Sequence, residues 1–268
     1  MSNIPKYYVN ATLTHKGVPN LSRQRGAKAH RNMQNMQQVP ENTIPFKQPA
    51  KAYRPRAIEL IPKSRNQENL ILNLQNPDQH IVVTAGPAGT GKTYLAMLAA
   101  VKAFRDGDCQ RIVITRPAVG VDDEQHGFLP GTLNQKMEPW TRPLMDVLRE
   151  YYRAQDITAM LDDGELEISP LAYMRGRTFK HSWIIADEMQ NATPAQVKML
   201  MTRIGVGSKI IITGDVEQAD RQRGDNGLLD LTERLLAQQV QGIAVCPMGQ
   251  RDIQRHPIIG SVLNLYND

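Results

Sequence analysis

The sequence predicts a three-layer α/β domain in which helices cover both faces of a mostly parallel β-sheet. Two observations support this fold class. Short apolar runs typical of buried strands alternate with longer segments that carry an apolar stripe at helical spacing. A glycine-rich segment also stands between one such strand and the helix after it. Alternation of this kind predicts parallel strands joined by helices that pack on the two faces.

The predicted elements follow one another from residue 58 onward. Strands are expected at His80–Thr84, Arg111–Thr115, Leu166–Ser169, Trp183–Ala186, Lys209–Thr213 and Ile243–Cys246. Helices are expected at Ser64–Leu74, Lys92–Phe104, Leu133–Tyr152, Pro194–Met201, Gly227–Gln238 and His256–Tyr266. Thr193 is the expected N-cap of the helix that begins with Pro194. Pro139 and Pro143 are candidate breaks or kinks in the longest helix.

Residues 1–57 are predicted to be a basic, low-complexity arm that precedes a single domain at residues 58–268. They are rich in Asn, Gln, Pro and Lys and lack hydrophobic periodicity. Residues 1–65 hold 12 lysines and arginines against two acidic residues, whereas residues 66–268 hold 20 against 25. A basic arm on a slightly acidic body favours contact with a polyanion such as nucleic acid. A solubilising tail is the alternative.

The composition excludes several classes of protein. Hydrophobic residues make up 41% of the 268 residues, which is typical of a globular protein. The chain has no apolar run of about 18 residues and no apolar segment like that of a signal peptide near its start. Cys109 and Cys246 lie far apart and are expected to be buried small hydrophobic residues. We therefore expect a protein of the cytoplasm, without membrane contact, in a bacterium or a phage-infected host.

The glycine-rich segment carries the strongest chemical signal. It has the Gly-x4-Gly-Lys-Thr pattern of a phosphate-binding loop, or Walker A motif, and it fits a P-loop nucleoside triphosphatase. Backbone N–H groups of such a loop wrap a phosphate, Lys92 reaches the β- and γ-phosphates, and the hydroxyl of Thr93 ligates Mg²⁺. We therefore expect ATP and Mg²⁺ as the cofactors. The loop residues before Lys92 are Gly86, Pro87, Ala88, Gly89, Thr90 and Gly91.

Two polar strand ends complete the predicted site. Asp187 and Glu188 follow an apolar strand as a Walker B motif, and we expect Asp187 to hold Mg²⁺ and Glu188 to polarise the attacking water. Gln190 lies two residues further on, where an amide can sense the γ-phosphate. The next strand ends at Thr213, with Gln218 close behind, and a second sensor is expected there.

These motifs resemble those of superfamily 1 helicases. The phosphate loop matches motif I, Asp-Glu-x-Gln matches motif II and Gly-Asp-x-x-Gln matches motif III. Residues 115–117, which include Arg116, are similar to motif Ia, which in that group contacts single-stranded nucleic acid. Gln67 lies 19 residues before Gly86, where the group places a glutamine that reads adenine. A surface glutamine is the alternative at that position.

The resemblance narrows to the PhoH family, and it covers about residues 58–266. It rests on segments that occur in that family's order: Phe128–Gly131, Leu171–Arg177, Asp187–Asn191, Leu200–Arg203, Thr213–Val216 and Arg255–Pro257. PhoH-like proteins are ATPases associated with phosphate starvation, and some members with a nuclease domain are linked to RNA unwinding. The resemblance implies a helicase-like ATPase. The acidic loop from Val119 to His126 departs from the family pattern.

A superfamily 1 helicase has two motor domains, and the second supplies an arginine to the γ-phosphate. This sequence predicts one motor domain, so we expect a neighbouring subunit to supply the arginine within a ring-like homo-oligomer, with a hexamer as one option. Arg255 is the first candidate for this catalytic arginine, and Arg251 and Arg203 follow. A surface charge is the alternative for Arg255.

Three arginines on predicted loops are candidate nucleic-acid contacts: Arg116, Arg175 and Arg177. We expect these loops to face the same edge of the sheet as the phosphate loop, and binding to a phosphodiester backbone to weaken with salt. Tyr173 is equally a core residue or a platform for base stacking. His126, His181 and His256 show no metal-ligand spacing.

The sequence as a whole predicts an ATPase that acts on single-stranded nucleic acid, with RNA preferred over DNA. A nucleotide-gated assembly factor for protein partners is one alternative. A small-molecule kinase is a second, and the position of Glu188 for activating water argues against it.

Overall fold

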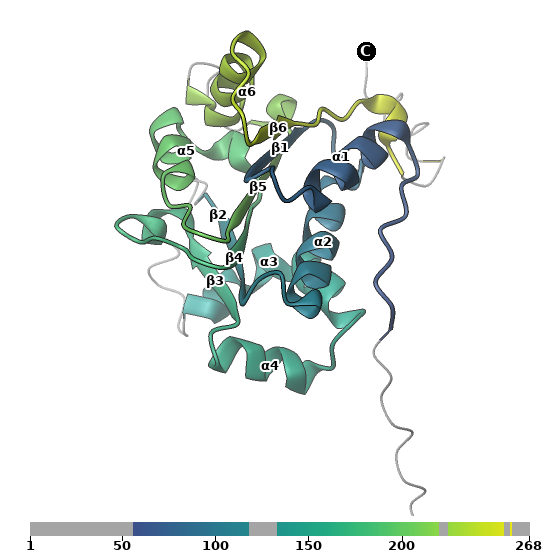
Figure 1. Cartoon of the computed structure of the whole chain (residues 1–268), viewed down its shortest axis with the longest axis vertical. Coiled ribbons are helices and arrows are strands. Elements are labelled where there is room, and N and C mark those ends of the chain that lie inside the picture. Colours follow the sequence, from purple (N-terminus) through teal and green to yellow (C-terminus); the bar gives the residue numbers. More distant parts are fainter. Residues whose placement is uncertain (1–55, 118–132, 220–224, 255–257, 259–268) are drawn as a thin grey trace, which may run out of the picture. The chain divides into compact units, whose positions relative to one another are not determined.

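The computed structural model describes residues 56–117, 133–219, 225–254 and 258 (Figure 1). Within them, six strands form one sheet in the order β3-β2-β4-β5-β1-β6, and every neighbouring pair is parallel. The strands are β1 (Ile81–Ala85), β2 (Arg111–Arg116), β3 (Leu166–Pro170), β4 (Ser182–Ala186), β5 (Lys209–Gly214) and β6 (Ile243–Val245). The predicted α/β class with a mostly parallel sheet is confirmed.

Helices cover both faces of the sheet. They are α1 (Arg65–Gln75), α2 (Lys92–Asp106), α3 (Leu133–Arg149), α4 (Ala154–Asp162), α5 (Pro194–Met201) and α6 (Gly227–Ala237). The short 3₁₀ turns are η1 (Leu171–Met174), η2 (Met189–Asn191), η3 (Val216–Gln218) and η5 (Gln250–Asp252). Figure 1 shows α1 and α2 on one side of the sheet and α5 and α6 on the other.

Each face has its own hydrophobic core. One core joins the sheet to α1, α2, α3 and α4, and the other joins it to α5, α6 and η1. Strand β5 contributes to both, because Ile211 belongs to the first core while Ile210 and Ile212 belong to the second. This alternation follows from the two-residue period of a strand. It explains why the central strands read as unbroken apolar runs.

Local sequence signals set several helix boundaries as expected. The hydroxyl of Ser64 accepts a hydrogen bond from the N–H of Gln67 and caps α1. Thr193 caps α5 in the same way, and the side chain of Gln196 accepts a bond from the N–H of Thr193. Pro194 occupies the first helical position. The predicted Thr193-Pro194 helix start is therefore confirmed.

The predicted helix at residues 133–152 is confirmed over most of its length. It is α3, which continues through both prolines and ends at Arg149, and a separate helix α4 that was not predicted follows at residues 154–162. The carboxylate of Asp156 accepts bonds from the backbone and the guanidinium of Arg153, which starts α4 at that point. The predicted final helix at residues 256–266 and the arm at residues 1–57 lie outside the described residues, apart from Ile258 and residues 56–57.

Candidate active site

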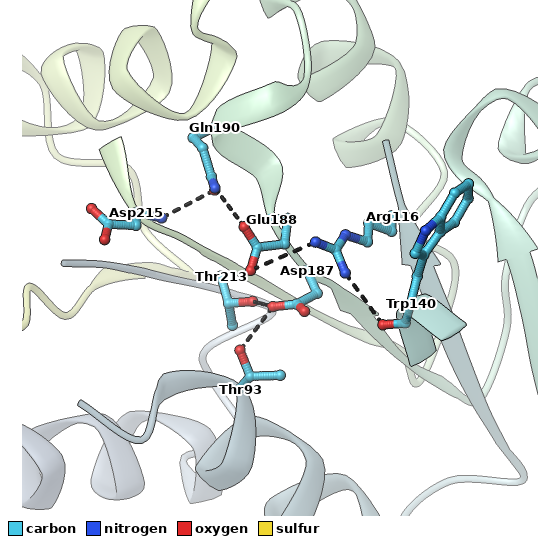
Figure 2. Close-up of polar contacts among 8 residues, drawn as sticks. All are labelled: Thr93, Arg116, Trp140, Asp187, Glu188, Gln190, Thr213 and Asp215. Carbon is cyan, nitrogen blue, oxygen red and sulfur yellow. Dashed lines mark hydrogen bonds and ion pairs between the residues drawn. The ribbon is translucent and has the colours of Figure 1, made fainter. Parts of the chain in front are cut away.

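The carboxyl ends of four neighbouring strands, β2, β4, β5 and β1, meet at one edge of the sheet. Strand β5 pairs with β1 on one side and with β4 on the other, so Thr213 lies between the phosphate loop and the acid pair. Strand β2 lies beside β4 and brings Arg116 to the same edge. Figure 2 shows the side chains that converge there.

Glycines of the predicted phosphate loop adopt backbone conformations that other residues rarely adopt. Gly89 and Gly91 have positive φ angles of 83°, a conformation that favours glycine. At Gly86 a side chain would meet the carbonyl oxygen of Met248 at 2.2 Å. The loop leads directly into α2, whose first N–H groups have no partner within the helix. Such a helix start favours an anion.

Lys92 lies in the first turn of α2 and is buried. Its ammonium donates to the carbonyl oxygens of Gly86 at 2.6 Å and Pro87 at 2.7 Å, and to the hydroxyl of Thr90 at 3.2 Å. The lysine therefore lies within the loop that it is predicted to serve. Binding a phosphate requires the ammonium to exchange carbonyl oxygens for phosphate oxygens.

Three distant segments hold the loop in shape. The buried amide of Gln67 donates to the carbonyl of Thr90 at 2.9 Å. The carboxylate of Asp215 accepts a bond from the N–H of Ala88 at 3.1 Å. The N–H of Gln254 donates to the carbonyl of Gly89 at 2.8 Å. The loop is therefore bonded to α1, to the residue after β5 and to the segment after β6.

Asp187 receives two hydroxyl groups. Its Oδ1 accepts hydrogen bonds from Thr93 at 2.8 Å and from Thr213 at 2.5 Å (Figure 2). Asp187 and Thr213 are buried. Oxygen donors of this kind suit Mg²⁺, which binds few protein ligands directly and keeps several waters. The donor set therefore fits the magnesium ion predicted for Thr93 and Asp187.

Glu188 faces a different set of partners. Its backbone is left-handed, with φ 55° and ψ 39°, which is uncommon for a residue other than glycine. This turn separates its carboxylate from that of Asp187. The amide of Gln190 donates to one carboxylate oxygen of Glu188 at 2.5 Å, and the guanidinium of Arg116 lies 3.9 Å from the other (Figure 2).

Gln190 links Glu188 to strand β5. Its Oε1 accepts a hydrogen bond from the N–H of Asp215 at 3.0 Å while its Nε2 donates to Glu188. Gly214 makes room for this amide, because a side chain there would meet Gln190 Oε1 at 2.4 Å. The geometry thus gives Gln190 a positioning contact with Glu188, and its predicted contact with a γ-phosphate stays a prediction.

Comparison with known proteins identifies the family. Residues 59–267 match the family model described as PhoH-like protein. This chain belongs to the PhoH-like family. The predicted family is therefore confirmed, and the chain has an α/β fold of the P-loop NTPase type.

Curated relatives give the same result. A PhoH-like protein of Synechocystis is 43% identical over 204 residues, which are 76% of this chain and 61% of the relative. A PhoH-like protein of Bacillus subtilis is 43% identical, covering 76% and 63%. Protein PhoH of Escherichia coli is 37% identical, covering 76% and 58%. The match thus spans less than two thirds of the length of each relative.

Solved structures resemble this PhoH-like chain only distantly. The Sulfolobus solfataricus SWI2/SNF2 ATPase core in complex with dsDNA gives a TM-score of 0.38 at 12% identity, covering 66% of this chain and 37% of that one. The Pif1 helicase from Candida albicans gives 0.34 at 13% identity, covering 76% and 44%. Neither score supports a conclusion about this PhoH-like chain.

The structure separates the arginines predicted to contact nucleic acid. Arg116 lies at the site edge, and its side chain is 25% exposed. Arg175 is exposed just after η1. Arg177 instead forms two hydrogen bonds with Glu167, in the amino-terminal half of β3, and its guanidinium lies over the ring of Phe179. The expectation that Arg177 faces the site edge is therefore wrong, because its carboxylate partner turns it away.

The remaining predicted residues have varied positions. Gln218 is exposed at the end of η3, and its contact with a nucleotide stays a prediction. Tyr173 is 60% exposed, which excludes the core alternative, and its role as a stacking platform stays a prediction. Arg251 is exposed in η5, and Arg203 donates to the carbonyl of Met199 at the far end of α5. Arg255 lies outside the described residues.

Sequence reasoning missed the groups that connect the motifs. The sequence predicts Asp215 only as part of a strand end, yet it bonds both to the phosphate loop and, through its N–H, to Gln190. The sequence does not predict the contacts of Gln254 and of the carbonyl of Trp140. The Gly-Asp pair at the end of β5 is an available signal for Asp215. No local pattern marks the other two residues.

The two cysteines lie away from the candidate site. Cys109 and Cys246 are buried free cysteines, as predicted. Burial raises the pKa of each thiol to about 11, so both stay protonated at neutral pH.

The described residues contain no group of three or more His, Cys, Asp or Glu side chains that could hold a metal ion. Nor does the described part contain a helix long and apolar enough to cross a membrane.

Proposed function

We propose that this chain hydrolyses ATP with Mg²⁺ and couples hydrolysis to the binding or remodelling of single-stranded nucleic acid, with RNA preferred. The main support is the position of Glu188 beside a loop of the ATP-binding type. Its carboxylate is held at the sheet edge by Gln190, next to the Thr93–Asp187 pair. If Asp187 and Glu188 had only a structural role, their carboxylates would not need to be separated and bonded to different partners.

The proposed chemistry uses each group in one role. The loop amides and Lys92 bind the β- and γ-phosphates, and Thr93 and Asp187 hold Mg²⁺, which when bound offsets phosphate charge. Glu188 accepts a proton from the attacking water. The water oxygen forms a bond to the γ-phosphorus as the bond from that phosphorus to the β–γ bridging oxygen breaks. The products are ADP and inorganic phosphate.

Nucleic acid is the proposed partner because of what lies beside this chemistry. Arg116 and Arg175 offer two cations, and Tyr173 offers an exposed aromatic ring on the turn that precedes Arg175. Guanidinium groups bind phosphodiesters in a fork geometry, and aromatic rings stack on unpaired bases. The basic segment at residues 1–65 adds positive charge. Binding of this kind is expected to weaken steeply with salt.

The experiment is an ATPase assay with and without single-stranded RNA or DNA, at low and at physiological salt. Glu188→Gln keeps the shape of the side chain but cannot accept the proton, so we expect kcat to fall by about 100-fold or more with ATP binding retained. A matched control is Glu217→Gln, an exposed acid on η3. Hydrolysis by Glu188→Gln at the wild-type rate would rule out the proposed role.

The measurements with RNA and DNA in the same assay test the proposed partner. Stimulation by RNA above that by DNA supports the proposal, and deletion of residues 1–57 shows whether the arm supplies the contact. If neither polymer binds or stimulates at low salt, while ATP is hydrolysed, the alternative of a nucleotide-gated protein assembly factor is favoured. Transfer of phosphate to a small acceptor would instead indicate a kinase.

A homo-oligomer is the proposed working form, because fast hydrolysis calls for an arginine near the γ-phosphate. Arg255 is the proposed donor from a neighbouring subunit. Mixing Lys92→Ala and Arg255→Ala subunits is expected to restore part of the activity that each lacks alone. Mixed oligomers that stay inactive would exclude this role for Arg255, and Arg251 would be tested next.

A further inference from the structure

The carboxylate of Glu188 is held from two sides by contacts of unequal strength. On one side the amide of Gln190 donates at 2.5 Å, and the N–H of Asp215 fixes that amide from behind. On the other side the guanidinium of Arg116 approaches only to 3.9 Å, beyond hydrogen-bond range. The contact of Gln190 with Glu188 is fixed by the fold, whereas a ligand can replace the contact of Arg116 with Glu188.

Arg116 touches three elements at once. It ends β2, its guanidinium lies beside Glu188 after β4, and it donates to the carbonyl of Trp140 in α3 at 3.2 Å (Figure 2). Arg116 thus occupies a position between the hydrolytic edge and a helix surface.

Solvent reaches both members of the ion pair. The side chain of Arg116 is 25% exposed and that of Glu188 is 35% exposed. An exposed ion pair at this distance contributes little stability and is screened by salt. A phosphodiester offers the same guanidinium two oxygens in a matching geometry. A phosphate that reaches Arg116 therefore competes well against Glu188.

We infer that Arg116 is a positioning residue for Glu188. Binding of a nucleic-acid phosphate to Arg116 changes how the carboxylate of Glu188 is held. Without nucleic acid, the guanidinium attracts the carboxylate and lowers the fraction of Glu188 that faces the attacking water. When a phosphodiester takes the guanidinium, Gln190 alone holds the carboxylate. This inference rests on the proposed function, and it names the residue through which nucleic acid regulates hydrolysis.

The test is to replace Arg116 and measure the basal and the stimulated rates separately. Arg116→Gln is expected to raise basal kcat about two- to fivefold, the rate equivalent of an ion pair of this exposure. The ratio of stimulated to basal rate is expected to fall by the same factor. Arg116→Lys keeps a cation and is expected to stay closer to wild type. A structural role alone predicts a lower basal rate in every variant.

Two controls show whether the effect acts through Glu188. Arg234→Gln removes an arginine from an exposed ion pair with Asp230 on α6 and is expected to leave both rates unchanged. Arg116→Gln combined with Glu188→Gln is expected to lose the gain in basal rate. Thermal unfolding of each variant checks that the fold is intact.

The outcomes separate this inference from the proposed function. If wild type is stimulated by single-stranded RNA but Arg116→Gln has a normal or lower basal rate, the inference is wrong and the proposed function stands. If Arg116→Gln gains basal rate while RNA and DNA never stimulate wild type, a phosphodiester is not the trigger, and both the inference and the proposed nucleic-acid partner are wrong. Absence of hydrolysis in every variant overturns both.

Discussion

Two buried lysines at opposite edges of the sheet make the same kind of contact for different reasons. Lys92 and Lys209 are 7% and 6% exposed. Lys92 donates to the carbonyls of Gly86 and Pro87, and Lys209 donates to those of Leu74 and Asn76 at 2.6 and 2.8 Å. Burial and hydrogen bonding alone do not distinguish them.

Helix direction does distinguish them. Lys209 meets the carboxyl end of α1, where the helix dipole favours a cation, and its ammonium lies 5.1 Å from the centre of the Trp183 ring. Lys92 lies at the amino end of α2, where the dipole opposes a cation and favours an anion. Lys209 thus lies at a helix end that favours its own charge. Lys92 lies at a helix end that favours a bound anion such as a phosphate.

Cavity size, taken alone, would point to the edge of the sheet that holds Lys209 and not to the predicted site. A cavity of about 930 Å³ opens at the edge that holds Lys209, with Trp183 and His80 in its lining, and it contains no residue of the predicted site. The position of a lysine relative to a helix dipole is therefore a better guide to phosphate chemistry here than the volume beside it.

The largest expected effect is on catalysis and separates the two lysines. Lys92→Ala should lower kcat by about 100- to 1,000-fold, because the charge that stabilises the transferred phosphoryl group is lost. Lys209→Met should hydrolyse ATP at the wild-type rate but lose about 1–2 kcal/mol of unfolding free energy at pH 9, since two carbonyls lose their donor. ATPase assays and denaturant unfolding check the pair. Loss of activity in Lys209→Met at full stability would refute the distinction.

A substitution at Gly214 disturbs the edge of the sheet that holds the site without removing a charged group. Gly214→Ala places a methyl group 2.4 Å from Gln190 Oε1 and 2.6 Å from Leu228, so we expect a loss of about 1–3 kcal/mol. Displacement of Gln190 should also lower kcat by about tenfold, through Glu188. Unfolding and kinetic measurements are compared with Gly249→Ala, where the added carbon meets its nearest neighbour at 3.9 Å. Equal effects of the two changes would contradict this explanation.

The smallest expected effect is a pH dependence that belongs to Lys209 alone. Burial lowers the pKa of Lys209 from 10.5 to about 8, and the charge of Asp108 opposes that shift. Between these values the unfolded chain binds more protons than the folded one, so the unfolding free energy rises with pH. The difference between wild type and Lys209→Met should therefore grow by about 1–2 kcal/mol from pH 8 to pH 10. A constant difference would exclude the lowered pKa.

Contiguous motifs made the centre of the site predictable from sequence. The glycines before Lys92 and the acids after β4 are each encoded within a few residues, and the strand before each motif sets which edge they reach. The same local logic placed Thr193 and Pro194 at a helix start. These features need no knowledge of which strands are neighbours.

Contacts between the motifs could not be predicted, because they depend on strand order. Asp215 reaches Ala88, and Gln190 reaches the N–H of Asp215, only because β5 lies between β1 and β4. Arg177 points away from the site because Glu167, on strand β3, supplies its partner. Sequence spacing carries no information about such pairings.

The left-handed backbone of Glu188 has a consequence for engineering. That conformation costs a residue with a side chain about 1–2 kcal/mol relative to the usual helical region, and glycine avoids most of the cost. A search for stabilising substitutions would therefore select against the carboxylate that the proposed reaction needs. At residue 188, the sequence that folds most readily and the sequence that works are expected to be different.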